Sequence, residues 1–151
     1  MKVPIGVSRV AYRCAYQGLR VYWFVRRPDV QGVKCVLTNG ECVLLVRHTY
    51  GHREWDLPGG AVRRREPPHD TARREMQEEL GVAVDRFTHL GDIRARIDHR
   101  RDTMHLYHAE LGDHPITMDP CELAEFAWFE RRTLPSELGR FVNRILAVLP
   151  G

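Results

Sequence analysis

Residues 60–82 carry the most informative pattern of this 151-residue chain, GAVRRREPPHDTARREMQEELGV. The pattern predicts a helix over residues 67–80, because proline is favoured in the first turn of a helix and Gly81 stands just past its end. Within it, Ala72, Met76 and Leu80 recur at helical spacing and form a narrow apolar stripe. We therefore expect this helix to pack against the rest of the domain along that stripe.

The same helix gathers acidic side chains on one face. Glu75, Glu78 and Glu79 stand at positions i, i+3 and i+4, with Arg74 at the edge of the group. Like charges at this spacing repel one another by a few tenths of a kcal/mol per pair, so helix stability gives no reason to keep them together. A bound hard cation would, and oxygen ligands alone suit Mg²⁺ or Mn²⁺, whereas zinc would recruit His or Cys. The alternative is a solvated acidic helix face.

With these residues in place, the segment resembles the Nudix box, G-x₅-E-x₇-R-E-U-x-E-E-x-G-U with U aliphatic, and every fixed position agrees. The similarity continues into LLVR at 44–47 and WDLPGG at 55–60, and into 122–129 with Leu134-Pro135. It covers most of the chain from Gly32 onward. One departure is Arg65, where members often have glycine, and it concerns the backbone conformation of the loop before the helix.

The resemblance implies a fold of the α/β (α+β) class, an α/β/α sandwich around a mixed β-sheet, here with an extra N-terminal helix. It also implies hydrolysis of a diphosphate bond in a nucleoside diphosphate linked to another moiety. By matching motif positions, Glu75, Glu78 and Glu79 would hold Mg²⁺ or Mn²⁺ with help from the Gly60 carbonyl. Arg74 would pair with the carboxylates and fix their rotamers. Glu66 would buttress the loop and helix, and Gly81 is a structural position of the motif.

The expected chemistry needs further groups beyond the metal ligands. A divalent ion neutralises the diphosphate and lowers the pKa of a bound water, and a base must then take the proton of that water. Either a Glu of the box or a carboxylate downstream could serve, and Glu122 is the best downstream candidate, against the alternative of an exposed loop residue. The catalytic candidates are therefore Glu78, Glu79, Arg74 and Glu122.

The candidates for substrate binding are Arg47, Arg63 and Arg65, because a guanidinium group binds phosphate in a bidentate manner. The alternative is that these arginines belong to a solvated loop.

The substrate is where the sequence is least informative, because signatures of particular Nudix subfamilies are absent. The leading class is hydrolysis of nucleoside diphosphate derivatives or nucleoside triphosphates. Two alternatives stay open. One is a non-catalytic nucleotide-binding sensor on the same fold, and the other is an RNA 5′-end pyrophosphohydrolase.

Composition indicates a single globular domain over residues 1–151, since 43% of the residues are hydrophobic and 28% are charged. We divide it into an N-terminal helical extension, 1–31, and a core, 32–151. A net charge of +3 is too mild to indicate a nucleic-acid partner, so we expect a small nucleotide as substrate; a homodimer stays open. No apolar run approaches the roughly 20 residues of a membrane span, and no signal peptide is evident, so we expect a cytoplasmic protein with reduced cysteines.

The remaining elements are predicted from periodicity. Residues 7–27 predict an amphipathic helix that ends at Pro28. Two β-rich runs, 32–38 and 41–47, predict a hairpin whose type I′ turn is Asn39-Gly40. That register places Thr38 opposite Glu41 and Cys35 opposite Leu44, which argues against a Cys35–Cys42 disulfide. Further strands are expected at 55–57, 103–111 and 123–129.

A closing helix is predicted over 136–149, with Ser136 as its N-cap residue. The histidines give a weaker signal. His105 and His108 stand on opposite faces of the predicted strand, so a histidine metal site is not expected.

Overall fold

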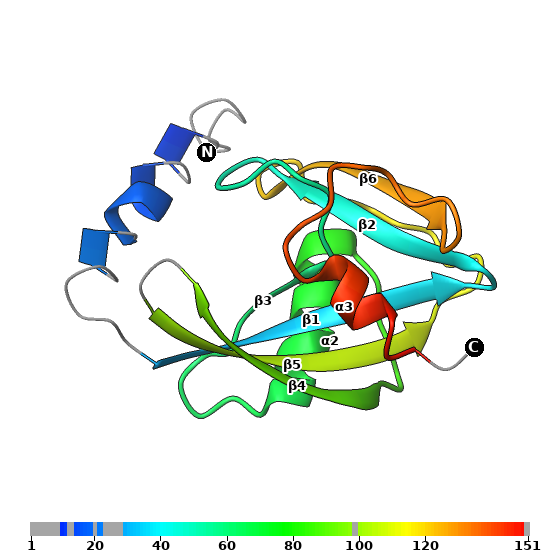
Figure 1. Ribbon diagram of the computed structural model, residues 1–151, viewed down its shortest axis with the longest axis horizontal. Coiled ribbons are helices and arrows are strands. Elements are labelled where there is room, and N and C mark those ends of the chain that lie inside the picture. Colours follow the sequence, from blue (N-terminus) through cyan, green and yellow to red (C-terminus); the bar gives the residue numbers. More distant parts are fainter. Residues whose placement is uncertain (1–9, 12–13, 20, 23–28, 98–99, 150–151) are drawn as a thin grey trace.

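The computed structural model describes residues 10–11, 14–19, 21–22, 29–97 and 100–149. Its centre is one mixed six-stranded sheet in the order β4-β5-β1-β2-β6, with β3 pairing on β1 (Figure 1). Only the β1–β5 pair is parallel among the pairings between these strands. The strands are β1 (Asp29–Asn39), β2 (Cys42–His48), β3 (Gly59–Ala61), β4 (Thr88–Ile97), β5 (Arg100–Glu110) and β6 (Leu123–Glu130).

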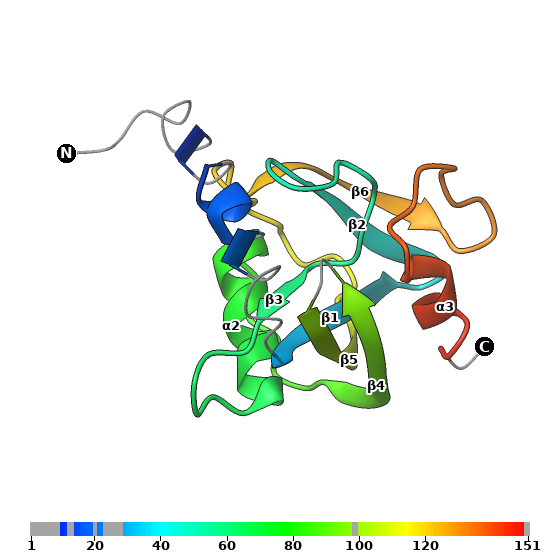
Figure 2. The ribbon, with the colours of Figure 1, turned by 60° about the vertical axis from the view of Figure 1, so that its left-hand side comes forward.

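Two helices cover opposite faces of the sheet, α2 (Pro68–Leu80) and α3 (Val142–Leu146) (Figures 1 and 2). Each face has its own apolar core, because side chains alternate between the two faces along every strand. On β5, Tyr107 belongs to the core under α2 and Leu106 to the core under α3. The expected α/β/α sandwich around a mixed sheet is confirmed.

The hairpin between β1 and β2 forms, but its predicted register is wrong by two residues. Asn39 pairs with Cys42 and Thr38 with Val43, so the turn residues are Gly40 and Glu41. Gly40 has φ +57°, which a type II′ turn requires at its first central position. The disulfide prediction is nevertheless correct, because Cys35 and Cys42 are both free thiols, like Cys14 and Cys121.

Three further strands differ from the prediction. β1 begins at Asp29 rather than at Gly32, because its first residues pair with β5 from Arg101 onward. β4 was not predicted at all, although the alternation of Ile93 and Ala95 with Arg94 and Arg96 is the period-two pattern of a half-buried strand. The strand expected at 55–57 is reduced to two isolated bridges, from Asp56 to Val46 and from Trp55 to Leu138.

The closing helix is shorter than predicted, five residues instead of fourteen, and Ser136 does not cap it. The reason is a tertiary contact. The Trp55 carbonyl accepts a hydrogen bond from the Gly139 N–H at 2.7 Å, and the Trp55 backbone N–H donates one to the Glu137 carbonyl at 2.8 Å. This pairing holds 137–139 extended, so the helix begins only after Phe141.

The N-terminal segment is helical at residues 10–11, 14–19 and 21–22, and the rest of the helix predicted for 7–27 lies outside the described residues. Its Tyr16 ring lies 5.7 Å from the ring of Tyr50, in the loop after β2. Among the described helices, none is both long and apolar enough to cross a membrane.

Candidate functional site

Helix α2 carries the acidic residues inward because its apolar stripe is buried. Ala72, Met76 and Leu80 are fully buried in the core under α2. Glu75 and Glu79 adjoin this stripe and are drawn in with it, with exposed fractions of 8% and 1%. A carboxylate buried to this degree is costly unless it is paired, protonated or bound to a cation.

The end of α2 is fixed by Gly81, which has φ +65° and donates its N–H to the Gln77 carbonyl. The next residue, Val82, donates its N–H to Met76. Glycine is favoured here because this left-handed conformation is strained for residues with a Cβ. This left-handed conformation, which ends the helix, gives Gly81 the structural role expected from the motif.

Two glycines on the neighbouring strand bring the backbone up to the carboxylates. Gly59 donates its N–H to Glu79 Oε2 at 3.1 Å. At Gly60, an added Cβ would overlap the carboxylate of Glu75. Strand β3 thus forms a cradle that only glycine leaves open, and the Gly60 backbone lies directly against an acidic side chain.

Arg74 holds the acidic group together with all five of its N–H donors. Its Nε and Nη2 bind the two oxygens of Glu66 at 2.8 and 3.0 Å. Its Nη1 binds Glu75 Oε1 at 2.6 Å and Glu78 Oε2 at 2.9 Å. The remaining donor of Nη2 reaches the Ala61 carbonyl at 3.1 Å. A single guanidinium therefore orients three carboxylates and the strand beside them.

Glu66 ties the preceding loop to α2. Besides Arg74, its Oε2 accepts hydrogen bonds from Thr71 Oγ1 at 2.8 Å and from the Arg63 backbone N–H at 3.1 Å. The hydrogen bond from Arg74, followed by those from Thr71 and Arg63, lowers the pKa of Glu66 to about 2. Glu66 is therefore ionised at neutral pH.

The two buried acids behave in the opposite way. Burial raises the pKa of Glu79 to about 8, and the charge of Glu75 adds to this rise. Burial also raises the pKa of Glu75 above its ordinary value, against the lowering effect of Arg74. Without a cation, burial therefore favours the protonated form of each of these two acids.

The loop before α2 has the conformation that glycine would adopt. Arg65 has φ +65°, alone among the described non-glycine residues in having a positive φ. The loop therefore keeps the conformation that the usual glycine would give it, and the Arg65 backbone is strained as a result.

Arg63 Nη2 lies 3.1 Å from Glu78 Oε1, so this arginine lies at the rim of the acidic cluster. Glu78 itself is exposed for 44% of its side chain.

The structure brings Glu122 into the same region but not Arg47. The charge of Glu122 raises the pKa values of both Glu75 and Glu79, so its side chain lies within their electrostatic range. Arg47 instead stacks over the ring of Trp55 at 4.5 Å, in the core under α3, and pairs with Glu137 at 3.0 Å. A phosphate at the acidic cluster is not within its reach, because the sheet lies between.

One neighbour of the cluster was missed by the sequence analysis. Lys34 Nζ binds Asp56 Oδ2 at 2.7 Å and the Leu57 carbonyl at 3.0 Å. Its charge lowers the pKa of Glu79 and so partly opposes the effect of burial. The sequence does mark Lys34 in one way, because it is the single charged residue in the otherwise apolar run 33–37.

The donor set at this site fits a hard divalent cation. Glu75 presents its carboxylate at the Gly60 backbone, Glu79 accepts the Gly59 N–H, and Glu78 shares Arg74 with Glu75, so the group is built from carboxylate oxygens. Oxygen-only coordination suits Mg²⁺ or Mn²⁺. A cation there would also relieve the repulsion between the buried carboxylates.

The NUDIX domain family matches this chain over residues 28–149. The ADP-ribose pyrophosphatase of Mycobacterium tuberculosis (strain ATCC 25618 / H37Rv) is 45% identical to it over 56 residues, 36% of this chain and 27% of that protein. An RNA pyrophosphohydrolase of Thioalkalivibrio sulfidiphilus is 34% identical over 74 residues, 49% of this chain and 41% of that protein. The chain thus spans less than half the length of either relative.

Solved structures show the same architecture. The crystal structure of a MutT NUDIX hydrolase from Burkholderia pseudomallei superposes with a TM-score of 0.75 at 24% identity, covering 81% of this chain and 98% of that one. At this identity the likeness establishes the fold.

Proposed function

Because the chain belongs to the NUDIX domain family, we propose that it is a divalent-metal-dependent pyrophosphohydrolase. It would hydrolyse a diphosphate linkage in nucleoside diphosphate derivatives or nucleoside triphosphates, by attack of water at phosphorus. The observation that carries this proposal is the pair of buried carboxylates on one face of α2, with Glu75 held by Arg74 against the Gly60 backbone and Glu79 accepting the Gly59 N–H. A solvated acidic helix face would leave both carboxylates exposed.

The proposed metal ligands are Glu75, Glu78, Glu79 and the Gly60 carbonyl. A divalent ion bound there would neutralise the diphosphate and lower the pKa of an attacking water. Arg74 holds Glu75 and Glu78 in a fixed orientation, which removes the cost of ordering them when substrate binds. Glu66 in turn fixes Arg74 through a bidentate pair.

We assign to Glu122 the removal of the proton from the attacking water. Its charge acts on Glu75 and Glu79, which supports a position beside the reacting centre. Its backbone carbonyl accepts the Thr49 N–H at 2.9 Å, so the segment that carries it is anchored to the end of β2. Arg63, at the rim of the cluster, is the stronger candidate for a phosphate contact, and Arg65 lies on the same loop.

The substrate class follows from the relatives only as a proposal. One relative is named for ADP-ribose and another for RNA, so the names do not agree on one substrate. The more similar of the two, at 45% identity, makes ADP-ribose and other nucleoside diphosphate derivatives the first compounds to test.

The test is a panel of nucleoside diphosphate derivatives, nucleoside triphosphates and 5′-triphosphorylated RNA, incubated with Mg²⁺ or Mn²⁺ and resolved by product identity. Glu78→Gln should lower turnover at least about a hundredfold, since it removes a proposed ligand. Glu41→Gln is the matched control, because Glu41 is exposed in the hairpin turn and pairs there with Arg131. Glu122→Gln should lower turnover while leaving metal affinity unchanged.

Oxygen-18 from solvent should appear in a phosphate product, and label on a sugar hydroxyl would exclude attack at phosphorus. No turnover above that of Glu78→Gln with any compound would favour the non-catalytic sensor. Turnover of RNA alone would favour the 5′-end pyrophosphohydrolase.

A further inference from the structure

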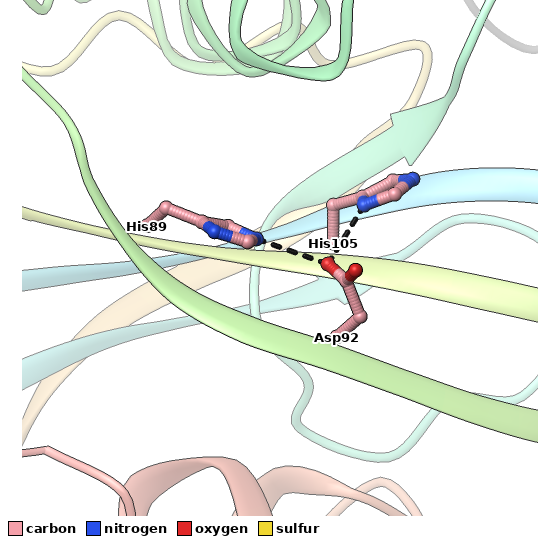
Figure 3. A group of neighbouring side chains, drawn as sticks. All are labelled: His89, Asp92 and His105. Carbon is pink, nitrogen blue, oxygen red and sulfur yellow. Dashed lines mark hydrogen bonds and ion pairs between the residues drawn. The ribbon is translucent and has the colours of Figure 1, made fainter.

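A second group of ligating side chains lies outside the acidic cluster, where the edge strand β4 meets β5 (Figure 3). His89 Nε2 lies 2.9 Å and His105 Nδ1 lies 2.8 Å from the same oxygen, Asp92 Oδ1. One ligand atom from each of the three residues lies within 4.8 Å of the others. Two imidazole nitrogens therefore converge on one carboxylate from neighbouring strands.

A β-bulge brings these residues to one face of the sheet. His89 and Asp92 are three residues apart, so in a regular strand they would point to opposite faces. The pairing with β5 shifts between His89 and Gly91, where Gly91 has φ +126°. As a result His89 lies opposite Tyr107 and Asp92 opposite His105, both on the α2 side of the sheet. Bulges are a common means of re-aiming a side chain.

His105 also has a hydrogen-bond partner for the ring nitrogen that does not face Asp92. The other ring nitrogen of His105, Nε2, lies 3.2 Å from Gln31 Oε1 on β1. Histidines that bind a metal through one nitrogen usually donate the N–H of the other to an oxygen, which fixes the tautomer and ring orientation. With Nδ1 as the ligand atom, His105 has that partner already in place.

We propose that His89, Asp92 and His105 bind one divalent transition-metal ion of the zinc class. Two imidazoles and one carboxylate form a ligand set that Zn²⁺ and its neighbours prefer and that Mg²⁺ does not. Side-chain exposures of 50% for His89 and 41% for Asp92 leave the site open to solvent for entry of the ion and for a further ligand. The ion would cross-link edge strand β4 to β5.

This site is separate from the acidic cluster. Across the sheet, Gly60 pairs with Val33, Val33 with His105, and His105 with Asp92. Three strand spacings of about 4.8 Å place the backbones of Gly60 and Asp92 about 14 Å apart. One ion cannot serve both groups, and the new site does not depend on the proposed hydrolase activity.

Calorimetric titration of the full chain with Zn²⁺, in millimolar Mg²⁺, tests the proposal. We expect one zinc ion to bind to the wild-type protein, and His105→Ala and His89→Ala each to weaken it at least about a hundredfold. His69→Ala is the matched control, because His69 Nε2 also lies beside a carboxylate oxygen, Asp70 Oδ1 at 3.0 Å, and is 57% exposed. It should change the zinc affinity by less than about threefold.

Two further variants keep the result interpretable. Gln31→Leu should weaken zinc by about tenfold, since it removes only the outer partner of His105. Glu79→Gln, which alters the acidic cluster, should leave zinc binding intact. The proposal is overturned if His89→Ala, at an exposed position, folds and binds zinc like the wild type. It is equally overturned if zinc binding disappears in Glu79→Gln and persists in His105→Ala.

Discussion

Arg74 and Arg47 carry the same guanidinium group into opposite faces of the sheet. Under α2, Arg74 is mostly buried and directs every donor to an oxygen of the acidic cluster or the strand beside it. On the α3 side, Arg47 lies over Trp55 and pairs with glutamates that are 54% and 70% exposed. On the α2 face the charges depend on one another, whereas on the α3 face an arginine chiefly contributes packing.

This contrast makes Glu79→Gln the change of largest expected effect. It removes a proposed metal ligand, so activity should fall at least about a hundredfold and the melting shift produced by millimolar Mg²⁺ should shrink. Melting curves of both proteins, with EDTA and with Mg²⁺, measure this. A wild-type shift no larger than that of the variant would contradict the metal site.

The same variant should change the pH dependence of stability. In the folded protein the pKa of Glu79 is raised from about 4.5 to about 8, so the folded state holds this proton more tightly than the unfolded chain. Its contribution to stability is then fully present below about pH 4.5 and is lost as pH rises to about 8. Urea unfolding of the metal-free proteins at pH 6 and pH 8.5 should show a smaller loss for Glu79→Gln.

A direct comparison of the two arginines comes next. Arg74→Lys keeps the positive charge but lacks the planar, five-donor guanidinium, so carboxylates of the cluster lose their hydrogen-bond partners. The variant should destabilise the protein by about 2–4 kcal/mol. Arg47→Lys should cost less than about 1 kcal/mol, because its ion pairs are exposed. It should also leave turnover within about threefold of the wild type. Equal losses of activity in the two variants would support the original prediction that Arg47 binds the substrate.

Gly60→Ala sharpens the distinction by changing only one methyl group. The added Cβ overlaps the Glu75 carboxylate, so we expect a loss of about 1–3 kcal/mol and a weaker response to Mg²⁺. Gly18→Ala is the control, since its Cβ would meet no atom within 4 Å and it lies in a helical segment. Similar unfolding free energies for the two variants would show that the close approach is unimportant.

The smallest expected effect is that of Arg65→Gly. Arg65 adopts a left-handed conformation that glycine enters without strain, so the variant should be more stable by up to about 1 kcal/mol. The gain is limited because glycine also makes the unfolded chain more flexible. Thermal unfolding measures it, and a destabilised variant would mean that the Arg65 side chain contributes more than its backbone strain costs.

Much of the α2 region was predictable because its signals are local. The prolines, the stripe of Ala72, Met76 and Leu80, and Gly81 act within one helix and its ends, and the helix found is 68–80. The spacing of Glu75, Glu78 and Glu79 likewise lies within two turns of that helix. The short C-terminal helix was not predictable, because a partner more than 80 residues earlier, Trp55, holds 137–139 extended.

The sequence by itself determined which residues share a helix face and which chemistry they carry, because helical and strand periods fix relative directions over a few residues. Only the tertiary structure decided which face each strand residue reaches and what it meets there. Arg47 turns to the side of α3, and a bulge turns His89 to the side of Asp92 and His105. Both outcomes depend on strand pairing between distant segments, and a shift of one residue in that pairing reverses the direction of a side chain.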